Sequence, residues 1–116
     1  MPRPRERTKD IAQAAPVFAA LGDPVRLQIV SRLCREGRLS ITQLTDGSRI
    51  SRQAITKHLN ALSAAGLIES ERCGRERRWQ IQIQRLHEVR NYLDQISAQW
   101  DQAIDRLRAL VERQEH

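Results

Sequence analysis

Residues 40–83 read SITQLTDGSRISRQAITKHLNALSAAGLIESERCGRERRWQIQI and decide the fold of this 116-residue chain. They predict a short helix, a turn, a second helix that ends at a glycine, and a basic hairpin. Ser51 is a favoured N-cap because its hydroxyl can accept a bond from an unpaired N–H of the first helical turn. Gly66 supplies the left-handed residue at which helices commonly end. This order predicts a helix-turn-helix, with its second helix over 51–65, followed by a wing.

The second helix has two chemically different faces. At 100° per residue, Ile55, Leu59 and Leu62 fall on one side and should face the core. The opposite side carries amide, hydroxyl and ammonium groups, which read base edges and phosphates in a DNA major groove. A solvated surface is the simpler interpretation for a lone helix, but the flanking turn and hairpin favour DNA. The predicted DNA contacts of this helix are Ser51, Arg52, Gln53, Thr56, Lys57 and Asn60.

The hairpin is predicted from strands over 68–72 and 77–83 around Cys73-Gly74-Arg75. Strand alternation should place Trp79, Ile81 and Ile83 on one face. Four basic residues lie near the tip, where they would contact phosphates beside the recognition helix. A hairpin that only keeps the chain soluble is the alternative, since charge on edge strands also blocks aggregation. The predicted DNA contacts of the wing are Arg72, Arg75, Arg77 and Arg78.

Capping residues flank the helix-turn-helix. Ser40 and Gln43 stand at the spacing of a capping box and should open its first helix. Asp23-Pro24 predicts an N-cap and the residue favoured at the first helical position, so an earlier helix should run from there to Gly37. Its inward residues by periodicity are Leu27, Val30, Leu33 and Cys34, which makes Cys34 a buried thiol.

The N-terminal part should hold one more helix, from about residue 10 to 21. Pro16 should kink this helix or reset its start. Before it, residues 1–9 read MPRPRERTK, a basic arm that we expect to be unstructured in isolation. The predicted organisation is therefore an arm (1–9), a DNA-binding body with an N-terminal dimer helix (10–85), and a C-terminal dimerisation helix (86–116).

Charge is spread unevenly over these parts. The net charge is +6, and residues 47–85 carry eight Arg or Lys against three acids, whereas residues 86–116 carry four against six. A basic body suits a polyanion, and the acidic tail suits self-association. The N-terminus has no apolar run, so we expect no signal peptide, no membrane span and a cytoplasmic protein.

The chain from residue 86 to 112 has a heptad pattern. Apolar residues recur every seven positions in two registers, as in a helix that packs along a partner helix. Such a helix is about 40 Å long, more than the small body needs. We therefore expect homodimerisation through this helix and the first one. The predicted dimer contacts are Ala14, Phe18, Leu86, Val89, Leu93, Ile96, Trp100, Ala103 and Leu107.

Over residues 10–112 the chain resembles the ArsR/SmtB family of winged helix-turn-helix regulators. The resemblance is carried by ALGDPVRLQIV (20–30), SRQAITKHLNALSAAGLI (51–68) and GRERRW (74–79). It implies a mainly α, dimeric winged helix-turn-helix with a small β-hairpin and element order ααααββα. It also implies a transcriptional regulator, most simply a repressor, that binds an inverted repeat in double-stranded DNA and is released by an inducer.

Metal sensing is not expected. Metal-sensing relatives place a Cys-x-Cys pair where this chain has Ser40 and Thr42, and the last helix offers His87 without a second histidine at suitable spacing. Zinc and soft metals need convergent Cys and His ligands. The chain is more similar to a non-metal-sensing branch, so we expect no metal, no cofactor and an inducer that the sequence does not identify.

Two alternatives stay open. One is a redox- or metal-responsive sensor of the same fold, with Cys73 at the wing turn as the candidate thiol. The other is a winged-helix module that binds protein, although such a surface would show an exposed apolar patch. An enzyme is not expected, since the sequence has no nucleophile elbow, HExxH or Walker loop.

Overall fold

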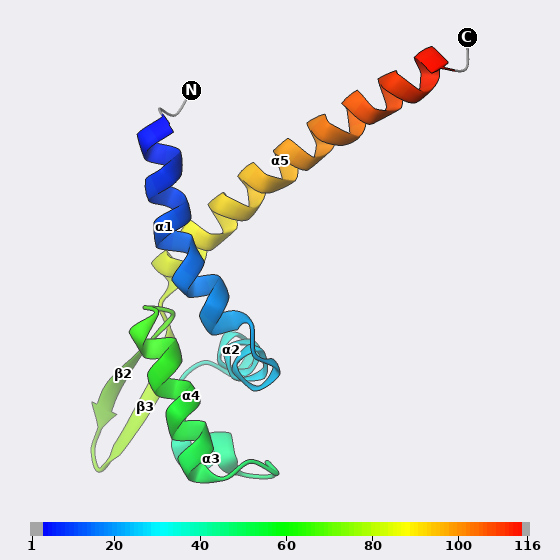
Figure 1. Cartoon of the computed structure of the whole chain (residues 1–116). Coiled ribbons are helices and arrows are strands. Elements are labelled where there is room, and N and C mark those ends of the chain that lie inside the picture. The colour runs from blue at the N-terminus through cyan, green and yellow to red at the C-terminus, as the bar shows by residue number, and fades with distance from the viewer. Residues whose placement is uncertain (1–3, 115–116) are drawn as a thin grey trace.

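The computed structural model describes the backbone of residues 4–114 and the side chains of residues 11–114. The predicted winged helix-turn-helix is confirmed, with one additional short strand. Figure 1 shows a small body from which the last helix projects as a long arm, and the chain spans 70 Å along its longest axis. The elements are α1 (Pro4–Leu21), α2 (Pro24–Glu36), β1 (Leu39–Ser40), α3 (Ile41–Thr45), α4 (Arg52–Ala64), β2 (Ile68–Cys73), β3 (Glu76–Ile81) and α5 (Ile83–Gln114).

The additional strand, β1, joins the hairpin to the body. The sheet has the order β1-β3-β2, and both pairings are antiparallel. Leu39 lies opposite Trp79, so the wing is hydrogen-bonded to the segment that leads into α3. The sequence did not predict β1 because two residues show no alternation that could be recognised.

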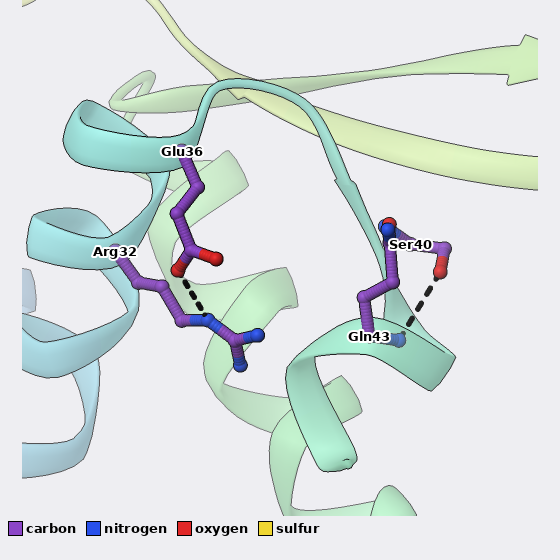
Figure 2. Close-up of polar contacts among 4 residues, drawn as sticks. All are labelled: Arg32, Glu36, Ser40 and Gln43. Carbon is purple, nitrogen blue, oxygen red and sulfur yellow. Dashed lines mark hydrogen bonds and ion pairs between the residues drawn. The ribbon is translucent and has the colours of Figure 1, made fainter.

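The predicted caps are confirmed by their hydrogen bonds. The Ser40 hydroxyl accepts from the Gln43 N–H at 3.2 Å (Figure 2), and Gln43 Oε1 accepts from the Ser40 N–H at 2.9 Å. Asp23 Oδ1 accepts from the N–H groups of Arg26 at 3.1 Å and Val25 at 2.9 Å. These bonds, first that of Arg26, hold the pKa of the Asp23 carboxyl below its ordinary value.

The hydrophobic core lies where α1, α2, α4 and the sheet meet. Leu59, Leu62 and Leu67 have no exposed surface, and each contributes about 1.5–3 kcal/mol through burial. The core thereby fixes the inner face of α4. Its other buried members are Val17, Ala20, Ile29, Val30, Leu33, Leu39, Leu44, Ile55, Ile68 and Val89.

The buried face of α2 differs from the predicted one. Ile29, Val30 and Leu33 are buried, whereas Leu27 is 51% exposed and Cys34 is exposed. The prediction that Leu27 and Cys34 face inward was therefore wrong. Two overlapping apolar stripes fit this helix, and its contacts with α1, α4 and β3 select the one centred on Ile29 and Leu33.

The first helix starts earlier than expected. It begins at Pro4, so residues 4–9 of the predicted unstructured arm are helical, while residues 1–3 lie outside the described residues. Pro16 neither interrupts the helix nor resets its start. Its ring is exposed, so the missing N–H is on the solvent side. Val17 faces the core instead, with 1% of its surface exposed.

The last helix also starts earlier than expected. Ile83 was predicted to continue the apolar face of a strand, but it begins α5 and is 67% exposed. The pairing of the hairpin explains this difference. Ile81 lies opposite Ile68, the first residue of β2, so a residue beyond it has no strand to pair with.

Candidate nucleic-acid interface

Helix α4 is held by its inner face and leaves its outer face in solvent. The Ser51 hydroxyl accepts from the Ala54 N–H at 3.2 Å and caps the helix as predicted. The predicted inward residues Ile55, Leu59 and Leu62 are all buried. A helix of 13 residues is about 20 Å long, which suits a DNA major groove.

The predicted reading face is exposed, with one exception. Gln53, Lys57 and Asn60 are exposed, whereas Thr56 is half-buried. The Thr56 hydroxyl donates to the Arg52 carbonyl oxygen at 2.8 Å. A base contact through this hydroxyl would compete with that bond, so Gln53, Lys57 and Asn60 are better placed than Thr56 to read DNA.

Two side chains from outside α4 contact it away from the reading face. His58 of α4 is half-buried, and its Nδ1 lies 3.9 Å from Oδ1 of Asp23, the N-cap of α2. At the other end, Arg85 Nε of α5 donates to the Ala65 carbonyl oxygen at 3.3 Å. The sequence did not predict the Arg85 contact, because no local pattern relates residues 65 and 85.

The four predicted wing arginines do not share one face. In the hairpin, Arg72 lies opposite Arg77 on the face that includes Trp79, which packs against the core. Arg78 lies opposite Glu71 on the other face, and its Nη2 is 3.6 Å from Glu76 Oε2. All four are exposed, and Arg75 sits in the turn itself. Among the described wing residues, Arg72 and Arg77 therefore lie opposite each other rather than opposite a carboxylate, and Arg77 Nη1 donates to Ser70 Oγ at 2.8 Å.

The other face of the sheet carries a polar network that the sequence did not predict. Arg38, which precedes β1, donates through Nε to Gln80 Oε1 at 2.8 Å and pairs through Nη1 with Glu71 Oε2 at 3.0 Å. Gln80 and Gln82 both donate to the Glu69 carboxylate, at 2.8 and 2.7 Å. The network links the residue before β1 to β3 and β2 and so helps fix the wing against the body.

The predicted dimer residues divide into two groups along α5. Where α1 packs against the start of α5, Ala14 of α1 and Val89 of α5 are buried within the chain. The Phe18 ring of α1 lies 5.8 Å from the Tyr92 ring of α5. Leu86 packs against the core. Ile96 and Ala103 are half-buried. Farther along, Leu93, Trp100 and Leu107 are exposed, together with Ile104, Leu110 and Val111. The projecting part of α5 in Figure 1 thus carries an apolar stripe that this chain does not cover.

The described residues hold neither a cluster of metal ligands nor a membrane-spanning helix. In that part of the chain, no three His, Cys, Asp or Glu side chains gather where they could hold a metal ion. Ser40 uses its hydroxyl as a helix cap. Cys34 and Cys73 are both free thiols. None of the helices between residues 4 and 114 is long and apolar enough to cross a bilayer.

Comparison with known proteins agrees with this geometry. A family model described as a helix-turn-helix domain matches residues 21–71. An HTH-type transcriptional regulator of Methanocaldococcus jannaschii is 30% identical over 84 residues, which covers 72% of this chain and 94% of the relative. The transcriptional repressor SmtB of Mycobacterium tuberculosis is 37% identical over 75 residues, which covers 65% of this chain and 53% of that protein. This chain thus spans about half of SmtB.

A solved structure extends the similarity to the fold. An ArsR-like transcriptional regulator from Rhodococcus sp. is 40% identical, with a TM-score of 0.72, and the match covers 85% of this chain and 92% of that one. The chain therefore belongs to the ArsR/SmtB family of winged helix-turn-helix transcriptional regulators, which are DNA-binding proteins and not enzymes.

Proposed function

We propose that the protein is a homodimeric repressor that binds an inverted-repeat operator. One α4 enters the major groove of each half-site, and each wing contacts the adjacent backbone. The observation that carries this proposal is the division of α4 between a buried apolar face and an exposed face with Gln53, Lys57 and Asn60. Those three side chains offer the donors and acceptors that distinguish base pairs in the major groove.

The wing supplies the sequence-independent part of binding. Arg72, Arg75 and Arg77 are exposed near the hairpin tip, and each phosphate that they neutralise adds salt-dependent affinity. The Arg38 network holds the wing against the body, which limits the freedom that the wing loses when it binds DNA. Repression follows if the operator overlaps a promoter.

The projecting α5 supports the dimer. Exposed apolar side chains along it, including Leu93, Trp100 and Leu107, would be covered by the same stripe of a second copy in a two-fold arrangement. Such a dimer presents two α4 helices to one face of the DNA, with half-sites one helical turn apart.

We further propose that the regulating signal is not a soft metal bound at the start of α3. Ser40 and Thr42 cannot supply thiolates, and the Ser40 hydroxyl is engaged as a cap. The similarity to SmtB covers 75 residues and does not supply thiolates at positions 40 and 42. A redox signal through Cys73 remains the second candidate, since its thiol lies in the wing beside the proposed phosphate contacts.

The test of this proposal is a Gln53→Ala variant in a binding-site selection from randomised DNA. Loss of the amide should relax the preference at one position of each half-site and cost about 1–3 kcal/mol in operator binding. Gln99→Ala, an exposed glutamine on α5, is the matched control and should leave the selected sequence unchanged. A selection profile that is the same for wild type and Gln53→Ala would show that α4 does not read bases through this residue.

A further inference from the structure

A cavity of about 250 Å³ lies between α1 and α5. Its volume suits a small organic molecule, somewhat below the range of typical ligand pockets. The lining is part apolar and part polar, which is the composition of a site that buries a hydrocarbon body and orients a polar group. Val17, Val89 and Tyr92 supply apolar surface, and Gln13, Asn91 and Gln95 supply amides.

One wall of this cavity is formed by Arg85 and Glu88. Arg85 Nη1 pairs with Glu88 Oε2 at 2.9 Å, while Arg85 Nε donates to the Ala65 carbonyl oxygen at the end of α4. The same guanidinium therefore faces the cavity on one side and binds the end of the proposed recognition helix on the other.

The contact between Arg85 and the end of α4 is close. A Cβ added at Gly66 would lie 3.3 Å from Arg85 Nε, so the guanidinium packs directly against the backbone where α4 ends. Gly66 adopts φ +77, the left-handed conformation that terminates the helix. A displacement of Arg85 would therefore remove both a hydrogen bond and a packing contact from this helix end.

We propose that the cavity between α1 and α5 is the inducer site, that it takes a small aromatic carboxylate, and that Arg85 transmits binding to α4. This inference rests on the proposed repressor function and names its regulation. The ligand carboxylate pairs with Arg85 in place of Glu88, and its hydrocarbon part packs against Val17, Val89 and Tyr92. Arg85 then moves away from the Ala65 carbonyl, and α4 loses the orientation that operator binding needs.

The exchange of carboxylates is energetically feasible. The Glu88 side chain is 54% exposed, and such a partly solvated ion pair contributes little stability, so its replacement by another carboxylate is nearly neutral. Burial of the ligand's apolar surface then supplies the favourable free energy. A neutral ligand of the same shape gains the burial but not the pairing with Arg85.

The position of the cavity also connects it with the proposed dimer. Ala14 and Val89 line it and were both predicted as dimer contacts. A partner subunit on α1 and α5 would lie beside its opening and shield the ligand from water, which strengthens the pairing with Arg85. If partner side chains fill the cavity instead, no carboxylate will bind there, and a titration will produce no shifts at Val17 and Val89.

The test uses the full chain with its selected operator, and benzoate, phenylacetate and neutral benzamide as probes at millimolar concentration. Methyl-labelled protein is titrated in solution by NMR, and operator affinity is measured by fluorescence anisotropy. We expect at least one of the two carboxylates to shift the methyl signals of Val17 and Val89 more than that of Leu44, which lies in α3. The same probe should weaken operator binding about tenfold, and benzamide should have a smaller effect on both readouts.

Variants separate binding from transmission. Arg85→Gln should abolish the shifts caused by the carboxylate. Arg85→Lys keeps a charge for the ligand but cannot also supply the fixed Nε donor, so it should retain the shifts and lose most of the change in operator affinity. Arg90→Gln, at an exposed position on the same helix, is the matched control and should behave as wild type.

Several results would overturn the inference. These are an absence of shifts at Val17 and Val89 with both carboxylates, equal binding of benzamide, or a full operator response in Arg85→Gln. A protein that binds its operator normally but ignores the probes refutes only the inducer site. A protein that selects no operator refutes the proposed function, while the methyl shifts still report whether the cavity binds carboxylates.

Discussion

Replacement of Trp100 by alanine should separate the proposed dimer into monomers. The side chain is 67% exposed in the single chain, which leaves about 170 Å² of a tryptophan surface of about 250 Å² available to a partner. At ~25 cal/mol per Å² its full burial would contribute about 4 kcal/mol per subunit, and the symmetry of the dimer doubles this value. Association also immobilises side chains, so we expect about half of that total to be realised.

A loss of about 4 kcal/mol raises the dimer dissociation constant about a thousandfold. Sedimentation equilibrium at micromolar concentration should therefore show a dimeric wild type and a monomeric Trp100→Ala. Trp100→Phe keeps most of the apolar surface and should remain largely dimeric. Leu27→Ala removes a similarly exposed hydrophobic side chain from α2, outside the stripe, and should have no effect. The reasoning is refuted if wild type is monomeric, or if Trp100→Ala dimerises as tightly as wild type.

Three other predictions concern the wing, Asp23 and metals. Arg77→Ala should weaken binding to all DNA sequences and reduce the salt dependence of the affinity by about one phosphate contact. Arg78→Ala should change the affinity and its salt dependence less, because Arg78 lies beside Glu76. An equal effect of the two variants in salt titrations would argue against the division of the wing faces. Because the pKa of Asp23 is lowered in the fold, the contribution of its carboxylate to stability is complete above the ordinary pKa and is lost as pH falls through the folded pKa. Asp23→Asn keeps the cap without the charge. In urea unfolding, the free energy of unfolding should therefore fall more steeply with decreasing pH in wild type than in Asp23→Asn. Zinc, cadmium or arsenite should leave operator affinity within error, and a change of tenfold or more, about 1.4 kcal/mol of coupling, would point to a site that the described residues do not reveal.

The sequence predicted correctly the helix ends that depend on hydrogen bonds between residues close together in the chain. The capping box of Ser40 and Gln43, the N-caps Asp23 and Ser51, and the left-handed Gly66 all depend on backbone groups within a few residues. The inner face of α4 was predictable because a single apolar stripe fits it.

The structure differs from the sequence-based predictions where contacts between residues far apart in the chain determine which side chains are buried and which segments pair. On α2 two stripes were possible, and packing against three other elements exposed Leu27 and Cys34. The apolar alternation of the hairpin continues to Ile83, but β2 supplies no partner beyond Ile68. Strand β1 exists only because Leu39 meets Trp79 across 40 residues of chain.

The candidate site was predictable in its outline but not in its geometry. Periodicity identified Gln53, Lys57 and Asn60, and the structure leaves all three exposed. The separation of Arg78 from Arg72 and Arg77 follows from strand alternation and could have been deduced from the sequence. The contact of Arg85 with Ala65 could not, since it depends on where α5 crosses the end of α4.

The most direct test of the account is hydroxyl-radical footprinting of the wild-type protein on DNA selected from a randomised pool. The account predicts an inverted repeat whose two protected half-sites are centred about 34 Å apart on one face of the duplex, with protection lost when Gln53, Lys57 and Asn60 are replaced together by alanine. A single unpaired site, a pool without sequence preference, or a footprint that survives the triple replacement would contradict it.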